Sequence, residues 1–229
     1  ATPSLLLGKL VHAGLEIFYR HRQLDVHLAA EDVAVRMRGL WPRLRDEAGL
    51  RFDTPKEEDA LQAQGVALVQ TYLAQADKTE RPLAVELAIE APLVNPATGE
   101  DLGLPMLGII DLVVHGEAGP TIVDFKTAAR GGEAVELLHE LQLSSYAFLV
   151  RQSLGLPEAA LEIRSLIKTK VPKVERHTYP AREMRHFGRL FAVLRAYVDA
   201  INIGRFHYRP GFHCQCCDFR ETQCRGWCG

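Results

Sequence analysis

The first 213 residues of this sequence contain no cysteine, and all five cysteines lie among the last sixteen residues. The disulfide framework of a small secreted protein is normally spread through its chain, so this distribution argues against that class. No apolar run approaches the roughly 18–20 residues that cross a bilayer, and no charged-then-apolar signal segment opens the sequence. We therefore expect an intracellular protein that has no membrane partner.

The sequence also lacks a surplus of positive charge. Its 27 Lys and Arg residues and 29 Asp and Glu residues give a net charge of −2. Any nucleic-acid contact must therefore come from local basic clusters and not from the overall field. The 229 residues, 47% hydrophobic and 24% charged, suit a globular protein with a sizeable core, as one large domain or one domain with appendages.

The spacing of apolar residues predicts helices that alternate with strands. The expected helices cover residues 4–22, 28–48, 57–76, 133–154 and 180–204. The expected strands cover residues 81–93, 107–115, 121–127 and 160–171. This order implies an α/β protein with a central mixed β-sheet flanked by helices. The expected division is one domain at residues 1–210, with a helical insertion at 28–80, and a cysteine-rich metal-binding tail at 211–229.

The segment GEAGP between two apolar strands is typical of a β-hairpin. If His115 and Pro120 close its loop, paired residues have numbers that sum to 235, so Asp111 lies opposite Asp124. Lys126 follows two positions later on the same face. Two carboxylates this close need a cation between them, and a hard divalent ion such as Mg²⁺ or Mn²⁺ prefers oxygen ligands. The alternative is a structural Asp–Lys pair with the second aspartate at a strand end.

Five motifs in consistent order resemble the PD-(D/E)XK nuclease superfamily, specifically its RecB-like branch. They are GKLVH at 8–12 (the helical Gly-x-x-x-His motif), Glu86 (an acidic residue on the preceding strand), GIID at 108–111, DFK at 124–126 and QLSSY at 142–146 (the Gln-x-x-x-Tyr signature). A lone D-x-K would be weak, whereas five ordered motifs that cover nearly the whole chain are strong. The resemblance implies a restriction-endonuclease-like core.

The resemblance also implies a metal-dependent DNA nuclease, and an exonuclease in preference to a sequence-specific endonuclease. The implied ligands of one or two Mg²⁺ or Mn²⁺ ions are His12, Asp111, Asp124 and the main-chain carbonyl of Phe125, with Glu86 as a ligand or a neighbour of the ligands. Such an ion polarises the scissile phosphate and lowers the pKa of a bound water. Lys126 would orient or help deprotonate that water, or stabilise the charge that develops on the phosphate.

Two helical stripes carry the remaining site residues. Gly8, His12 and Glu16 are four residues apart and share a face, and the missing side chain of Gly8 would let this helix approach the sheet closely. Gln142 and Tyr146 share a face of a later helix, and their polar tips could reach a phosphate or a base. A lone helical histidine is more often a core or surface residue, and Tyr146 could simply pack.

Two other polar residues near these motifs leave alternatives open. Glu90 shares the strand face of Glu86 and is the alternative match, and either residue could be an ordinary solvated carboxylate. His139 precedes the Gln-x-x-x-Tyr motif on the same helix, and we expect it at the surface.

The cysteine-rich tail predicts a second metal site. Cys214, Cys217 and Cys224 have a spacing that resembles the C-terminal half of the iron–sulfur clamp of CRISPR-associated RecB-like exonucleases and AddAB-type nuclease domains. This implies a [4Fe-4S] cluster, but the fourth cysteine of those relatives lies upstream of the Gly-x-x-x-His helix, where this sequence has none. Either the natural protein begins further upstream, or Cys228 or Cys216 completes the site. A local site of Cys214, Cys217, Cys224 and Cys228 would also suit Zn²⁺, and either metal would hold the tail to the domain.

Basic residues for DNA binding are expected on the predicted strand at residues 160–171. Arg164, Lys168 and Lys170 share one face of it, and phosphate contacts from such residues give binding that does not depend on base sequence. Runs of charge are more often solvated faces. No segment resembles a base-reading module, so we expect cleavage to depend on strand structure or ends, in single-stranded DNA or at duplex ends.

Other functions remain open. One is a non-catalytic DNA-binding or scaffold domain of a larger helicase–nuclease complex, although the full set of Asp111, Asp124 and Lys126 argues against it. Another is a metal-stapled interaction domain whose activity depends on a helicase or on a CRISPR or recombination partner.

Overall fold

A computed structural model describes residues 2–116, 118–132, 136–205, 211, 214 and 217–224. The chain forms two compact units, residues 1–188 and 189–229. The helices are α1 (Pro3–Gln23), α2 (Ala30–Ala48), α3 (Pro55–Gln75), α4 (Glu136–Leu154) and α5 (Met184–Asn202). The strands are β1 (Pro82–Val94), β2 (Asp101–Gly116), β3 (Gly119–Ala128), β4 (Ala160–Ile167) and β5 (Lys173–Pro180). None of the helices in the described residues is long and apolar enough to span a membrane.

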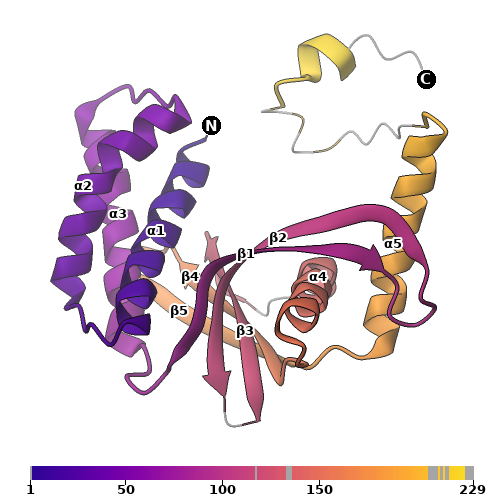
Figure 1. Cartoon of the computed structure of the whole chain (residues 1–229). Helices are drawn as coiled ribbons and strands as arrows, with labels where there is room; N and C mark the ends of the chain where they lie inside the picture. Colours follow the sequence, from indigo (N-terminus) through magenta and orange to yellow (C-terminus); the bar gives the residue numbers. More distant parts are fainter. Residues whose placement is uncertain are drawn as a thin grey trace. The chain divides into compact units, whose positions relative to one another are not determined.

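The first unit is built on one mixed sheet with the strand order β1-β2-β3-β4-β5 (Figure 1). Only β3 and β4 run parallel, because α4 carries the chain from the end of one to the start of the other. The other neighbours are antiparallel. The expected central mixed sheet flanked by helices is therefore present.

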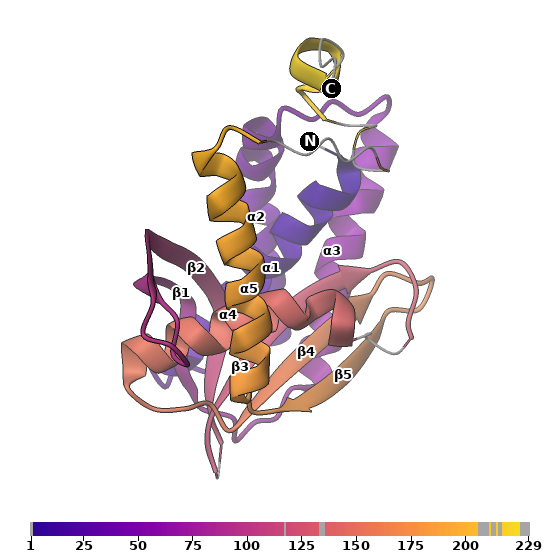
Figure 2. The ribbon, with the colours of Figure 1, turned by 90° about the vertical axis from the view of Figure 1, so that its right-hand side faces the viewer.

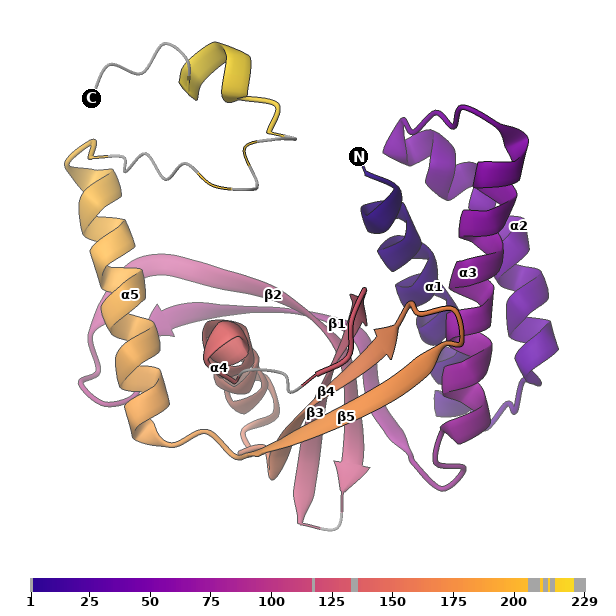
Figure 3. The ribbon, with the colours of Figure 1, turned by 180° about the vertical axis from the view of Figure 1, so that it is seen from behind.

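Helices cover both faces of this sheet. The bundle of α1, α2 and α3 lies on one side and α4 on the other, as the views from opposite sides show (Figures 1 and 3). Figure 2 looks onto the α4 side, with the three-helix bundle behind the sheet. The largest buried cluster joins the bundle to the sheet, where Tyr19 and Tyr72 pack against Phe125.

The β2–β3 hairpin has the register that the sequence predicts. His115 pairs with Pro120 and Leu112 pairs with Val123, so paired numbers sum to 235. The part of β2 before Leu112 pairs with β1 alone, and the two strands form a ribbon that arches over α4 (Figure 1). The contact is close at Gly108, where an added Cβ would collide with the Leu149 side chain of α4.

The helix ends follow from local sequence. Thr2 caps α1 through a hydrogen bond that Oγ1 accepts from the Leu5 N–H at 3.3 Å, and Pro3 occupies the first turn, where its missing N–H costs nothing. Thr54 and Pro55 repeat this arrangement at the start of α3. The observed helices begin and end within about four residues of the expected ones, the usual uncertainty of sequence-based boundaries.

The strand expected at residues 160–171 is wrong in its last four residues. β4 ends at Ile167, the chain turns, and a fifth strand returns antiparallel as β5. β5 occupies the edge of the sheet, and its residues alternate only between half-buried and exposed, so it carries a weak apolar signal. Lys168 and Lys170 therefore lie in the turn between β4 and β5 and not on a strand.

The second unit contains most of α5 and a π-helical segment at Arg220–Cys224. The expected boundary between residues 210 and 211 falls where residue 210 lies outside the described part of the chain. Cys216 and Cys228 also lie outside it.

Candidate active site

Strands β2 and β3 separate at Asp111. Their pairing ends at Leu112 and Val123. In the fork that opens there, Oδ2 of Asp111 accepts a hydrogen bond from the backbone N–H of Phe125 at 2.7 Å. The carboxylate thus satisfies a backbone donor at the point where strand pairing stops, and this hydrogen bond fixes Asp111 at the mouth of the fork.

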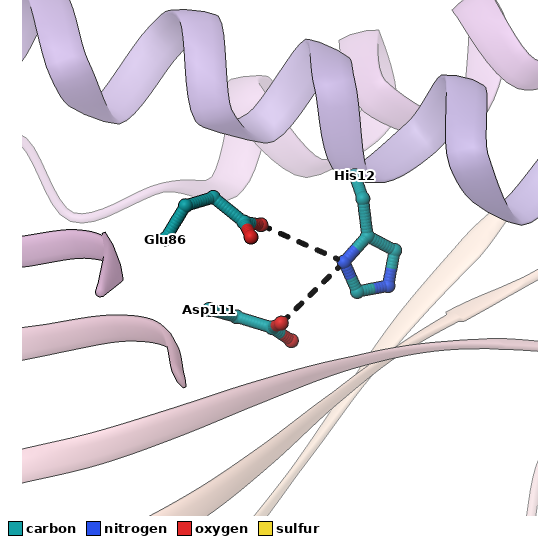
Figure 4. Close-up of side chains that lie close together, drawn as sticks. All are labelled: His12, Glu86 and Asp111. Carbon is teal, nitrogen blue, oxygen red and sulfur yellow. Dashed lines mark ion pairs between the residues drawn. The ribbon is translucent and has the colours of Figure 1, made fainter. Parts of the chain in front are cut away.

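α1 brings His12 to the same fork. Its Nδ1 lies 3.6 Å from Oδ1 of Asp111 and 4.0 Å from Oε1 of Glu86 (Figure 4). The imidazole meets the ring of Phe125 edge-on, with 6.5 Å between ring centroids. Burial alone would lower the pKa of His12, but the hydrogen bond and charge of Asp111, with smaller contributions from Glu86 and Asp124, raise it above its usual value.

Glu86 occupies the position opposite Asp111 on the neighbouring strand, since Val85 pairs with Leu112 and Leu87 with Ile110. Its backbone has φ 46°, in the left-handed region that a glutamate rarely adopts. Such a conformation costs about 1–3 kcal/mol and is found most often at functional sites. Burial first, and then the charge of Asp111, raise the pKa of Glu86 to about 7.

Asp124 is almost completely buried, at 1% exposure, and pairs with Lys126. The Lys126 Nζ lies 2.9 Å from Oδ1 and 2.7 Å from Oδ2. Only the first contact has hydrogen-bonding geometry, so Oδ2 is a buried oxygen without a hydrogen bond. Burial raises the pKa of Asp124 to about 6, because it outweighs the opposing effect of Lys126.

Gln142 of α4 ties this pair together. Its Oε1 accepts a hydrogen bond from Lys126 Nζ at 3.0 Å, and its Nε2 lies 3.1 Å from Oδ1 of Asp124 and 2.9 Å from the hydroxyl of Tyr146. Gln142 and Tyr146, four residues apart on one helical face, are therefore both in contact with this part of the site. Burial raises the pKa of the Tyr146 hydroxyl to about 12, so it is a hydrogen-bonding group and not a base near neutral pH.

The donor set suits a hard divalent cation. Within the described residues, His12, Glu86 and Asp111 are the group of three metal-ligating side chains whose ligand atoms all lie within 4.8 Å of one another. The two carboxylates match the ligand preferences of Mg²⁺ and Mn²⁺, and the imidazole adds a nitrogen donor of the kind that transition metals accept. Oδ2 of Asp124, which has no hydrogen bond, is a fourth donor nearby and the third oxygen.

The expected site residues thus fall into two adjacent sets. His12, Glu86 and Asp111 converge, whereas Asp124 lies outside that group and is held by Lys126 and Gln142. The main chain of Phe125 is at the site through its N–H, and a role for its carbonyl stays a prediction. Glu90, the alternative to Glu86, is exposed further along β1.

The expected roles of Gly8 in α1 and His139 in α4 change in the structure. A Cβ added to Gly8 would lie 3.5 Å from Oγ1 of Thr127, an ordinary contact, so α1 is near the sheet there without requiring a glycine. His139 is half-buried, not on the open surface. Burial and the charge of Lys126 lower its pKa, which places His139 within electrostatic reach of the site.

Arg164 is not available to DNA, contrary to the sequence-based prediction. It is 2% exposed, and its guanidinium donates hydrogen bonds to Glu80 at 2.5 Å and Glu162 at 2.7 Å. It also donates to the hydroxyls of Tyr72 and Tyr19, at 2.7 and 3.1 Å. Every direction of the guanidinium is therefore occupied inside the protein.

Lys168 and Lys170 lie in the turn after β4 and not on a strand face with Arg164. Nζ of Lys168 donates a hydrogen bond to Oγ of Ser4 at 2.7 Å, at the beginning of α1. Lys170 is exposed. DNA contacts by these two lysines stay predictions.

Three of the tail cysteines, Cys214, Cys217 and Cys224, are half-buried and free of disulfides. They do not form a metal-sized group among the described residues. The backbone N–H of Gly211 donates to Sγ of Cys214 at 3.3 Å, a weak contact. The predicted iron–sulfur or zinc site is therefore without structural support in the part of the chain that is described.

Sequence reasoning missed the network around Arg164 as a support of the site. Tyr19 and Tyr72 hydrogen-bond to each other at 2.5 Å, and both pack on Phe125 between the two halves of the site. The signal available was Glu162, two residues before Arg164 in a largely apolar strand, because an arginine on a buried strand face needs such a partner.

Comparisons with known proteins agree with this geometry. The family model described as the PD-(D/E)XK nuclease superfamily matches residues 1–225. A search of curated proteins found no significant match.

Two solved structures are similar to this chain at low sequence identity. The crystal structure of a candidate exonuclease from Eubacterium rectale is 14% identical, with 97% of this chain and 75% of that chain covered and a TM-score of 0.59, a likeness that concerns the fold alone. A structure of a protein named SSO0001 is 11% identical, with 94% of this chain and 83% of that chain covered and a TM-score of 0.44.

Proposed function

Because the chain belongs to the PD-(D/E)XK nuclease superfamily, we propose that it is a metal-dependent DNA nuclease of the RecB-like branch that hydrolyses phosphodiester bonds as an exonuclease. The observation that carries this proposal is the convergence of His12, Glu86 and Asp111 within 4.8 Å, beside the Asp124–Lys126 pair. The exonuclease form is supported by the order of the motifs, and the fold is shared with a protein described as a candidate exonuclease.

In this proposal His12, Glu86, Asp111 and Oδ2 of Asp124 hold Mg²⁺ or Mn²⁺, with the carbonyl of Phe125 as a further ligand. When bound, the ion supplies Lewis acidity toward the scissile phosphate and lowers the pKa of an attacking water. The backbone N–H of Phe125 orients Asp111 by its hydrogen bond, so one ligand is positioned in advance.

Lys126 acts on the attacking water and on the charge that develops on the phosphate. Its side chain is 31% exposed, which leaves it accessible to a substrate, while Asp124 and Gln142 fix the direction of the ammonium. An ammonium fixed before the reaction stabilises a transition state without paying for reorganisation. Gln142 and Tyr146 orient the ammonium on one side and reach the DNA on the other.

Cleavage of end-labelled DNA tests the proposal. The wild type with Mg²⁺ or Mn²⁺ should release nucleotides or short fragments from linear DNA, and EDTA should abolish the release. DNA labelled at the 5′ or the 3′ end, in single-stranded and duplex form, then gives the polarity and the preferred strand state.

Lys126→Ala should bind DNA nearly as well as the wild type but lose about 10²–10³-fold in kcat, since its interaction strengthens in the transition state. Lys56→Ala is the matched control, because Lys56 is an exposed lysine at the start of α3. Equal cleavage by wild type and Lys126→Ala would indicate a contaminating nuclease. Absence of cleavage with every metal would favour a non-catalytic DNA-binding or scaffold domain.

A further inference from the structure

Arg22 is nine-tenths buried near the end of α1, with no hydrogen-bond acceptor for its guanidinium among the described residues. Its guanidinium carbon lies 5.7 Å from the centre of the Phe18 ring. The nearby carboxylate of Asp77 accepts hydrogen bonds from the N–H and hydroxyl of Thr79 at 2.7 and 2.8 Å. Those bonds, with a smaller contribution from Arg22, lower the pKa of Asp77. The guanidinium nitrogens are not among the buried polar atoms that lack a hydrogen bond, so they face the two pockets that Arg22 lines and are accessible to a ligand.

Two pockets share this arginine. One has a volume of about 500 Å³ and the other of about 510 Å³. Arg22, His27 and Lys78 line both of them, so these three residues form the boundary between the pockets. Each volume is within the range of pockets that enclose small molecules.

The two pockets differ in chemistry. The first is walled mainly by apolar side chains of α1, the loop after it and α3, among them Phe18, Leu28, Leu73 and Ala74. The second is polar, and Arg81 adds another cation to the shared three residues. The ligand that fits has an apolar part for the first pocket and an anionic part at the boundary.

Cationic side chains outnumber acidic ones in the lining of the second pocket. The acidic residues of the lining are Asp25 and Glu80, and Glu80 is ion-paired with Arg164, which also pairs with Glu162. Asp77 lies near Arg22 outside the lining. The donors Arg22, Lys78, Arg81 and His27 on one pocket wall suit an anion such as a phosphate monoester.

We propose that Arg22, His27 and Lys78 bind the phosphate of a nucleoside monophosphate whose base occupies the apolar pocket beside Phe18 and Leu73. The choice of a nucleotide among phosphate esters rests on the proposed function, because nucleotides are the products of a DNA nuclease. Binding itself requires neither cleavage nor a metal ion.

The site is separate from the metal site. Arg22 follows His12 by ten residues of the same helix, which corresponds to about 15 Å along its axis. None of the residues that line the two pockets belongs to the group of His12, Glu86 and Asp111. A nucleotide bound there therefore occupies a second site and not the position of a product at the metal.

Calorimetric titration in EDTA tests the site with deoxyadenosine 5′-monophosphate as the probe. Deoxyadenosine and inorganic phosphate test the two halves of the ligand, and each should bind at least about tenfold more weakly than the nucleotide. Arg22→Gln should weaken nucleotide binding by about tenfold or more, because a charge-assisted contact is lost. The control Arg43→Gln, at an exposed arginine of α2, should bind within about twofold of the wild type.

A second variant keeps the test independent of Arg22. Ala74→Trp fills the apolar pocket from an exposed position of α3, so it should weaken nucleotide binding while phosphate binding stays unchanged. Asp111→Ala should bind the nucleotide like the wild type. A 5′-phosphorylated oligonucleotide that competes with the nucleotide would identify a strand end as the source of the same chemistry.

Four results would overturn the proposal. Two of them are an absence of nucleotide binding at about 1 mM and equal nucleotide binding by the wild type and Arg22→Gln. The third is phosphate binding as tight as nucleotide binding, which would indicate an adventitious ion only. The fourth is loss of nucleotide binding in Asp111→Ala, which would place the ligand at the metal site. Since no assay here requires cleavage, failure of this site and failure of the nuclease proposal are distinguishable.

Discussion

Two adjacent strands of the sheet carry charge into the interior, and they do so in opposite ways. On β4, Arg164 pairs with Glu80 and Glu162 and with two tyrosine hydroxyls. On β3, Asp124 is as deeply buried, yet one of its oxygens has no hydrogen bond. The two clusters are close neighbours, because Phe125 pairs directly with Arg164 across the strands.

The difference is also visible in the pKa shifts. Burial alone would raise the pKa of Glu80, but the hydrogen bonds and charge of Arg164 lower it below its usual value. Burial instead prevails at Asp124 and Glu86, whose pKa values rise to about 6 and about 7. A buried cluster with complete partners is a structural element, whereas carboxylates with raised pKa values mark a candidate functional site, which we propose holds a cation.

Among substitutions that test the difference between the two clusters, the largest expected effect is on the rate of DNA cleavage. Asp111→Asn removes the charge of the residue that contacts both His12 and Phe125, and should lower cleavage by at least about 10²-fold and weaken Mn²⁺ binding as well. Glu80→Gln, in the other cluster, should leave metal affinity within about twofold. Rates and Mn²⁺ titrations on folded protein measure both, and equal losses in the two variants would remove the distinction.

The second effect is on stability. Arg164→Met leaves Glu80 and Glu162 buried without their cation, and should destabilise the protein by about 3–5 kcal/mol in urea unfolding. Lys126→Met removes a cation from a carboxylate that can take up a proton, so its cost should be smaller at pH 5 than at pH 8. A cost for Arg164→Met below about 1 kcal/mol would contradict the structural role of the first cluster.

The two clusters should respond to pH with opposite signs. In Asp124 and Glu86 the folded pKa lies above the unfolded value, so the folded state binds more protons, and the metal-free protein should lose stability as pH rises from about 4 to about 7. The raised pKa of His12 acts in the same direction, since its contribution is lost as pH rises through the folded pKa. Glu80, with a lowered pKa, contributes stability above its unfolded value of 4.5 that is lost as pH falls through its folded pKa.

Thermal melts from about pH 2 to about pH 8 in EDTA measure these signs, since the window of Glu80 lies below 4.5. Glu86→Gln should reduce the loss of stability as pH rises towards 7, and Glu80→Gln should reduce the loss of stability as pH falls below 4.5. Added Mn²⁺ should reverse the decline in the wild type, because ions that bind only the folded state stabilise it. A pH profile that is the same in both variants would refute the assignment of the two clusters.

The smallest effect concerns the tail. Iron with brown colour after anaerobic purification, or stoichiometric zinc by elemental analysis, would support a metal held by Cys214, Cys217 and Cys224, with Cys228 or Cys216 as the fourth ligand. A protein without either metal would remove the predicted tail site and leave the first unit unaffected.

The sequence predicted those parts of the fold that depend on local signals. The hairpin register follows from a short loop between His115 and Pro120, and the helices follow from their apolar spacing and their Thr-Pro starts. The apolar pattern of the sequence did not predict β5, because this edge strand has little apolar alternation. The burial of Arg164 was not predicted, because its partners Glu80 and Tyr19 lie 84 and 145 residues away in the sequence.

The candidate site was predictable in its residues but not in its arrangement. The order of His12, Glu86, Asp111, Asp124 and Lys126 is readable in the sequence. The left-handed backbone of Glu86 was not, because that conformation is imposed by the surrounding strands. An Asp–Lys pair was one of the alternatives that the sequence left open, but the contact of Gln142 with Asp124 was not predictable, because it depends on how α4 packs on the sheet.

The measurement that tests the central claim most directly is the position of a bound ion. In a crystal of the protein soaked with Mn²⁺, the account predicts an anomalous scattering peak between His12, Glu86 and Asp111, within about 2.5 Å of at least two carboxylate oxygens. The peak should vanish in Asp111→Ala and persist in Arg164→Met. A peak elsewhere, or none at saturating Mn²⁺, would contradict the claim that this cluster exists to hold a divalent cation.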